Sequence, residues 1–143
     1  MVKRTMAITI ALLAMSASAA YAQQCLHGPT ETPDQTARRR EALTATRTIN
    51  NIQHNQPGLA QRSFFRHDQL AESPIGKSLA ASPNELSRRM SLSADGEILP
   101  GWKLTLDVSE NGYWFMIKDT TDTCGFAYIS NHMGVIYTSE PIR

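Results

Sequence analysis

Residues 102–119 constrain the fold most, because they combine a strand-like alternation with a turn signal. Every second residue of "WKLTLDVS" is apolar, starting at Trp102, which is the pattern of a half-buried β-strand. Asn111 and Gly112 follow, a pair typical of the central positions of a type I′ turn, where both residues need positive φ. "YWFMIKDT" then returns as an apolar partner strand. These residues predict an antiparallel hairpin.

Two further strands are predicted after this hairpin. "FAYIS" and "VIYTS" are short runs rich in aromatic and β-branched residues, separated by a polar turn at residues 131–134. Because each connection is short, consecutive strands should pair in order. The last third of the chain therefore predicts a four-stranded antiparallel meander.

The strongest helix signal begins near residue 32. Thr32 suits the N-cap, Pro33 the first helical position, and Gln35 completes a capping box. Apolar residues then recur at spacings of three and four, which predicts one buried stripe; they are Ala42, Ala45, Ile49 and Ile52. Pro57-Gly58 is the expected end of this helix.

The pattern between residues 59 and 100 is weaker. "ASPNELSRRM" predicts a short helix with Ser82 as N-cap and Pro83 in its first position, whereas "ESPIGKSLAASP" and "SADGEILPG" are interpreted as loops. Phe64 and Phe65 are expected to fill the core. The fold class predicted from the whole pattern is α+β, with the long N-terminal helix packed on the four-stranded sheet.

The first 22 residues have the organisation of a secretory signal peptide. Lys3 and Arg4 precede an apolar run at residues 6–15, and Ala20-Tyr21-Ala22 is a small-x-small cleavage site. One alternative is a membrane anchor, but the run is shorter than the ~20 apolar residues needed to cross a bilayer. The other is a lipoprotein, since Cys25 follows closely, but Gln23 and Gln24 stand where a lipobox requires small residues. We therefore predict a signal peptide at 1–22, a single domain at 23–143, a periplasmic or secreted location, and no stable membrane anchor after cleavage.

Cys25 and Cys124 are the two cysteines of the chain. In an oxidising compartment such a pair normally forms a disulfide. The alternative is a reactive thiol or a metal ligand, but the sequence has no CxxC motif and no zinc-type spacing of cysteine and histidine. We expect a structural disulfide between these residues.

Composition and motifs indicate no specific chemistry. Cleavage would leave 12 basic residues against 13 acidic ones, a balance that argues against nucleic acid as a partner. The histidines at positions 27, 54, 67 and 132 are scattered, and the sequence contains no HExxH, GxSxG, phosphate-loop or EF-hand pattern. We therefore predict no catalytic, cofactor-binding or metal-binding residue. Aromatic residues on the strands become a binding candidate if the sheet face away from the helix leaves several exposed.

Two stretches carry a resemblance to a known family. "ALTATRTINNIQ" (42–53) is similar to the amphipathic helix that opens the globular domain of type IV pilins and pseudopilins, and "GFAYISNHMGVIYT" (125–138) is similar to its closing strand pair. The prepilin pattern, a Gly followed by Phe-Thr-Leu-Ile-Glu and a long apolar helix, is not in the sequence. The resemblance implies a released, pilin-like structural or binding domain, with no catalytic residue to carry over.

Two hypotheses of function follow. The first is a secreted, non-catalytic pilin-like structural or interaction module, held by one disulfide, for which the sequence leaves a protein partner open. The second is a small periplasmic enzyme or enzyme inhibitor whose site is built from the 59–100 region. A cleft that joins His67 to a carboxylate would favour the second.

Overall fold

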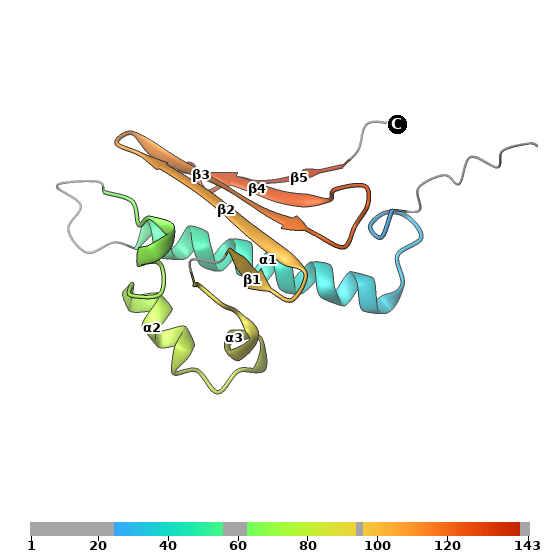
Figure 1. The fold of residues 1–143 in the computed structure, drawn as a ribbon, viewed down its shortest axis with the longest axis horizontal. Coiled ribbons are helices and arrows are strands. Elements are labelled where there is room, and N and C mark those ends of the chain that lie inside the picture. Colours follow the sequence, from blue (N-terminus) through green and yellow to red (C-terminus); the bar gives the residue numbers. More distant parts are fainter. Residues whose placement is uncertain (1–24, 56–62, 94–95, 141–143) are drawn as a thin grey trace, which may run out of the picture.

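The computed structural model describes residues 25–55, 63–93 and 96–140 (Figure 1). The helices are α1 (Pro33–His54), the 3-10 turn η1 (His67–Gln69), α2 (Pro74–Ala80) and α3 (Glu85–Arg89). The strands are β1 (Glu97–Leu99), β2 (Trp102–Ser109), β3 (Gly112–Asp119), β4 (Ala127–Asn131) and β5 (Ile136–Ser139). The predicted signal peptide and the Pro57-Gly58 stop signal lie outside the described residues.

The N-terminus of α1 is capped as the sequence predicts. The Thr32 side chain accepts a hydrogen bond from the backbone N–H of Gln35 at 3.2 Å, and the Gln35 side chain accepts one from Thr32 N at 2.8 Å. This capping box satisfies two backbone donors that the helix itself leaves unpaired. The predicted stripe is also confirmed, since its four apolar residues are all buried.

The α+β class and the antiparallel meander are confirmed, but the sheet has five strands in the order β1-β2-β3-β4-β5 rather than four. The additional strand is β1, which the sequence assigned to a loop. Its three residues are too few to show an alternation, yet Ile98 and Leu99 are buried in the core. Gly101, with a φ of 76°, allows the tight turn after Pro100 that pairs β1 with β2.

The β2–β3 hairpin forms where it is expected, but with a different turn. Ser109 pairs with Gly112, so Glu110 and Asn111 are the central residues, and neither has positive φ. The predicted type I′ turn is therefore wrong. Gly112 begins β3 instead, where a Cβ atom would lie 2.8 Å from His132 Nδ1. The glycine is needed for close packing rather than for the turn.

The segment between α1 and the sheet contains more helix than predicted. Residues 74–80 form α2 instead of a loop, because the Ser73 hydroxyl caps it by accepting from Gly76 N at 2.9 Å. The N-cap of α3 is Asn84 and not Ser82, since Asn84 Oδ1 accepts from the backbone N–H groups of Leu86 and Ser87. None of the helices in the described residues is long and apolar enough to cross a membrane.

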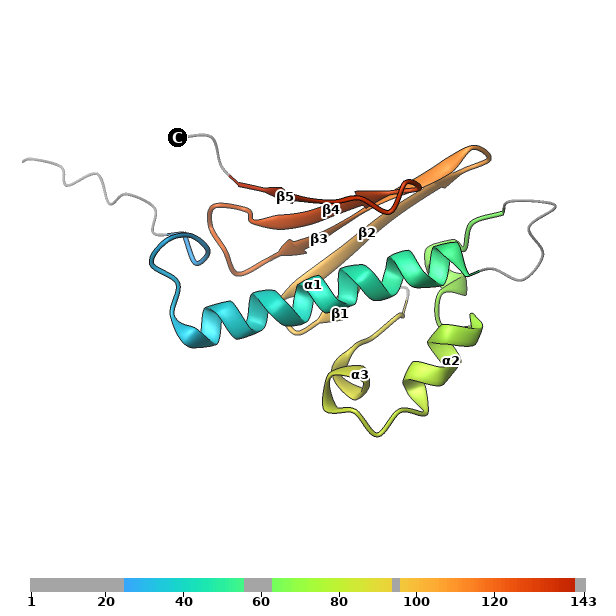
Figure 2. The same cartoon turned by 180° about the vertical axis from the view of Figure 1, so that it is seen from behind.

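All the helices lie on one side of the sheet (Figures 1 and 2). The stripe of α1 packs on one face of β2, β3 and β4, and Leu70, Leu92 and Ile98 extend the same core. Phe64 and Phe65 are half-buried against this core, in agreement with the prediction. The other face of the sheet is covered by no segment that the structure describes, and we call it the open face.

Candidate functional site

The predicted disulfide between Cys25 and Cys124 is present. It joins residues 99 positions apart, whose Cα atoms are separated by 5.2 Å. Cys25 precedes α1 and Cys124 lies in the loop between β3 and β4. The bond therefore ties the start of the described chain to the same end of the sheet as the start of β4.

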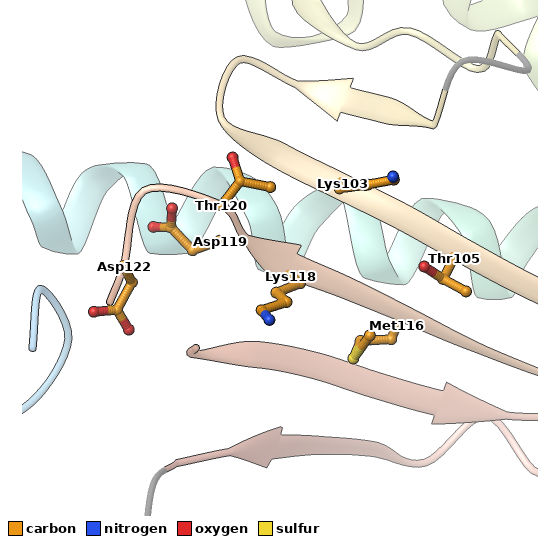
Figure 3. Close-up of a pocket in the computed structure, with 7 residues that line it drawn as sticks. All are labelled: Lys103, Thr105, Met116, Lys118, Asp119, Thr120 and Asp122. Atoms are coloured by element: carbon orange, nitrogen blue, oxygen red, sulfur yellow. The ribbon is translucent and has the colours of Figure 1, made fainter. Parts of the chain in front are cut away.

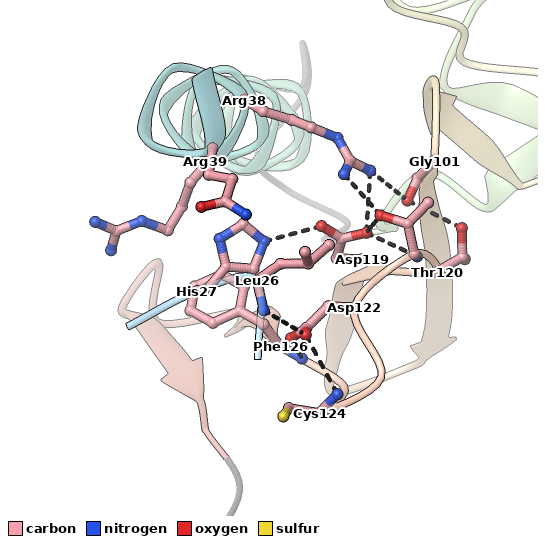
Figure 4. Close-up of polar contacts among 12 residues, drawn as sticks. Leu26, His27, Arg38, Arg39, Gly101, Asp119, Thr120, Asp122, Cys124 and Phe126 are labelled. Atoms are coloured by element: carbon pink, nitrogen blue, oxygen red, sulfur yellow. Dashed lines mark hydrogen bonds and ion pairs between the residues drawn. The ribbon is translucent and has the colours of Figure 1, made fainter. Parts of the chain in front are cut away.

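Asp122 organises the backbone around the disulfide. Its carboxylate accepts hydrogen bonds from Leu26 N at 3.0 Å, Cys124 N at 3.2 Å and Phe126 N at 3.0 Å (Figure 4). One buried side chain thus bonds the backbone of both segments that the disulfide links.

Asp119, at the end of β3, is the centre of a second set of contacts. Its side chain is fully buried, and it accepts from His27 Nε2 at 2.8 Å and from Arg38 of α1 at 3.0 Å. It also accepts from the backbone N–H and the hydroxyl of Thr121, at 2.8 and 2.7 Å. The Asp119 carboxylate therefore joins the N-terminal segment, the first turns of α1 and the sheet.

His27 lies between two carboxylates. Its Nδ1 is 3.1 Å from Glu31 Oε1, its Nε2 faces Asp119, and its side chain is only 2% exposed. Each ring nitrogen therefore lies within hydrogen-bonding distance of a carboxylate oxygen. The ring also packs against Phe126, with 4.5 Å between ring centroids. We call the disulfide together with His27, Glu31, Asp119 and Asp122 the disulfide clasp.

The acidic groups of the clasp are held in the ionised form. Burial by itself would raise the pKa of the Asp119 carboxyl, but hydrogen bonds from Thr121 and His27 and the charge of Arg38 outweigh burial and lower the pKa. For Asp122, burial is outweighed by the three backbone hydrogen bonds, and for Glu31 by His27 and Arg39, so both pKa values are also lowered.

We expect these shifts to make the protein less stable in acid. The unfolded carboxyl groups, with pKa values near 4, bind protons at a pH where the folded ones do not, so stability is complete above this range. It is lost as pH falls through the lowered pKa values of the folded state. Urea unfolding between pH 7 and pH 2 measures this. The urea concentration at the unfolding midpoint should decrease once the pH is below about 4, and the decrease should be less steep in Asp119→Asn. A midpoint that stays constant or rises in acid contradicts the assignment.

The clasp is suited to structure rather than to catalysis. His27 and Asp119 form a histidine–carboxylate pair, but both ring nitrogens are engaged by carboxylates and the ring is out of contact with solvent. A general base needs a free nitrogen within reach of a substrate proton. The pair therefore fixes the N-terminal segment in place.

A second buried polar cluster joins α1 to the sheet at the other end of the helix. The Asn50 side chain exchanges hydrogen bonds with the Ser130 hydroxyl, at 2.9 and 3.1 Å, and accepts from the Tyr113 hydroxyl at 3.1 Å. Burial raises the pKa of Tyr113 to about 12, so its hydroxyl remains a donor. These bonds pin the register of α1 against β3 and β4.

The structure does not bring the four histidines together. His27 is in the clasp, His54 ends α1 beside Tyr113, His67 is in η1, and His132 is in the β4–β5 turn. Among the described residues, no carboxylate bonds the His67 side chain, and no group of three or more potential ligands could hold a metal ion.

The open face carries the exposed aromatic residues of the sheet. Strand alternation places these residues on it: Lys103, Thr105, Asp107, Trp114, Met116, Lys118, Ala127, Ile129, Asn131, Tyr137 and Ser139. Trp114 is 43% exposed and Tyr137 is 52% exposed. Met116 and Ile129, both half-buried, lie between them in the sheet. Aromatic side chains therefore stay exposed on the face away from the helix, which is the condition under which the sequence makes this face a binding candidate.

Two cavities adjoin these features. One of about 320 Å³ is on the open face near the end of β3 (Figure 3), and it is lined by Lys103, Thr105, Met116, Lys118, Asp119, Thr120 and Asp122. The other, of about 300 Å³, lies where α1 meets the β1–β2 turn. Three charged residues of its lining are already paired, since Arg89 bonds Glu41 at 2.9 Å and Arg38 bonds Asp119. The first cavity contains Lys103 and Lys118 and lies on the face with the exposed aromatic residues, so we take it as the stronger candidate for a ligand site.

Sequence reasoning predicted the disulfide but missed the two carboxylates beside it. Asp119 and Asp122 lie in "KDTTDTC", directly after a strand and before a cysteine. A short polar segment in that position is typical of a solvent-exposed turn, and the partners that make it a buried site are far away in sequence. His27 is two residues from Cys25, which was the one available signal.

Comparison of the chain with protein-family models, with curated protein sequences and with solved structures gave no match.

Proposed function

We propose that the chain is an exported, non-catalytic interaction module that binds a protein partner through the open face of its sheet. The observation that carries this proposal is the exposure of Trp114 and Tyr137 on a face that no described segment covers. Tyrosine, tryptophan and methionine are enriched in protein–protein interfaces, and contiguous exposed apolar side chains mark interaction sites.

The rest of the fold supports this role by making the face rigid. The open-face residues project from strands, which hold side chains more precisely than loops do. Hydrogen bonds hold both ends of α1 against the opposite face of the sheet: Arg38 bonds Asp119 of the clasp, and Asn50 bonds Ser130. A pre-organised face loses less entropy on binding, which favours affinity.

The export part of the proposal rests on the signal-peptide pattern of residues 1–22 and on the disulfide, which fits an oxidising compartment such as the periplasm or the exterior. We also propose that the module is pilin-like. This rests on the order of its elements, a long helix followed by an irregular segment and an antiparallel meander. In this proposal the domain is released after cleavage and acts as a structural or binding unit.

The enzyme or inhibitor alternative receives no specific support. It requires a site in the 59–100 region, and in the described part of that region His67 is not joined to a carboxylate. We therefore do not develop it further.

Site-specific photo-crosslinking in cells that export the chain tests the proposal. A benzophenone amino acid is placed at Trp114 or Tyr137 on the open face, and, as matched controls, at exposed Thr44 of α1 or Ser78 of α2. We expect an adduct of one defined mass from the two open-face positions only, because only that face contacts the partner. The same adducts at all four positions, or none at Trp114 and Tyr137, would overturn the proposal.

A further inference from the structure

Two lysines stand opposite each other on the open face. Lys103 of β2 and Lys118 of β3 are paired in the register of the sheet, and both line the cavity of about 320 Å³ (Figure 3). Like charges in directly opposed positions destabilise a strand pair. Neither ammonium group has a hydrogen bond or an ion pair with any residue that the structure describes.

The nearby acidic residues are engaged elsewhere. Glu97 is opposite Lys103 on β1, but its carboxylate accepts from Gly101 N at 2.8 Å. Asp119 and Asp122 also line the cavity, and their oxygens are held by the donors of the clasp. Among the described residues, these three carboxylates therefore form no ion pair with either lysine, although two of them line the same cavity.

The lysine side chains lean apart. Lys103 Cε lies 3.6 Å from the position that a Cβ atom on Gly96 would take, and Lys118 Cε lies 3.7 Å from the corresponding position on Gly125. The side chain of Lys103 thus extends toward β1, and the side chain of Lys118 extends toward the β3–β4 loop. Besides the two lysines, the cavity is lined by Thr105, Met116, Thr120 and the two carboxylates of the clasp.

An apolar row leads away from this cavity. Met116, which lines the cavity, is in register with Ile129 of β4, and Ile129 is in register with Tyr137 of β5. At ~4.8 Å between neighbouring strands the row extends for roughly 10 Å, a length that a few residues of extended peptide can cover. Trp114 stands beside the row. The cavity that holds the two lysines is therefore continuous with this apolar row.

We propose that the open face takes a short peptide segment of a partner protein in which an aspartate or glutamate adjoins apolar residues. The carboxylate enters between Lys103 and Lys118, and the apolar side chains lie across Met116, Ile129 and Tyr137. This inference rests on the proposed function and adds the chemistry of the partner. A lipid surface fits less well, because an array of anionic headgroups would also meet Asp107, which is exposed on the same face, whereas a peptide can place a single carboxylate at the two lysines.

Selection of a display library of short random peptides on the purified, disulfide-bonded protein tests this inference. Enriched peptides should carry Asp or Glu next to aliphatic or aromatic residues. A synthetic peptide of the enriched sequence should bind Lys103→Gln/Lys118→Gln about tenfold more weakly than the unmodified protein, a difference of about 1.4 kcal/mol, and more weakly at high salt. Lys77→Gln is the matched control, since Lys77 is an exposed lysine of α2 paired with Glu72.

The outcomes separate this inference from the proposed function. Enriched peptides without acidic residues, no enriched peptide at all, or equal affinity for the lysine double variant would each overturn the inference. Lysine-dependent sedimentation with phosphatidylglycerol vesicles, without peptide binding, would also overturn it in favour of a lipid. In each case cross-linking at Trp114 and Tyr137 to a single protein would still support the interaction module.

Discussion

Replacing Cys25 and Cys124 together by serine is expected to lower the free energy of unfolding by about 4–5 kcal/mol. The disulfide spans 99 residues, and closing a loop of that size removes much of the conformational entropy of the unfolded chain. Whole domains are stable by only about 5–15 kcal/mol, so this is a large share of the total. For a domain of this size the loss corresponds to a fall in Tm of roughly 15–20 °C, which thermal and urea unfolding can measure.

Reduction supplies the matched control for this prediction. The unmodified protein in excess dithiothreitol should unfold close to the double serine variant, and the variant itself should not respond to reductant. The double variant is preferred to Cys25→Ser, because a lone Cys124 thiol can form intermolecular disulfides. Equal unfolding midpoints for the oxidised protein and the double variant would show that the bond does not stabilise the fold.

Asp119→Asn should have the second largest effect, a loss of about 3 kcal/mol. The carboxylate accepts four hydrogen bonds from His27, Arg38 and Thr121, and its side chain is fully buried. The amide of asparagine removes the charge and directs an N–H group toward a donor. Breaking a buried charge pair from one side leaves the remaining charges uncompensated.

Asp107→Asn is the matched substitution for Asp119→Asn. Asp107 is exposed on the open face, and its carboxylate bonds the Trp114 indole at 3.1 Å, so stability should change little. His27→Gln combined with Asp119→Asn should cost less than the sum of the single changes, since the two residues share one interaction. A strictly additive double variant, or an Asp119→Asn protein as stable as the Asp107→Asn protein, would contradict the role of the clasp.

The parts of the fold with strong local signals could be predicted from the sequence. The capping box at Thr32, the stripe on α1 and the alternation from Trp102 onward each depend on neighbouring residues, and each is present in the structure. The predicted disulfide is present too, because two cysteines allow only one intramolecular pairing.

The missed features depend on residues that are far apart in sequence. β1 is a strand only because β2 pairs with it, and its buried residues complete a core that α1 has already begun. α2 has a Ser73-Pro74 start like the Thr32-Pro33 start of α1, but it is too short to show an apolar stripe. Asp119 meets its His27 partner 92 residues away. No pattern within either segment contains that contact.

The position of the disulfide also decides how the protein responds to mechanical load. The bond joins Cys25 to Cys124 just before β4, and β5 ends beside the start of β4, where Ser139 pairs with Ala127. Tension between residues 25 and 140 would peel β5 and then β4 from the sheet while the covalent loop that contains α1, β2 and β3 stays closed. The oxidised chain could lengthen only by residues 125–140, roughly 55 Å at ~3.4 Å per residue. Reduction of the disulfide would let the whole segment between residues 25 and 140 extend, so the reduced chain could lengthen much further than the oxidised one.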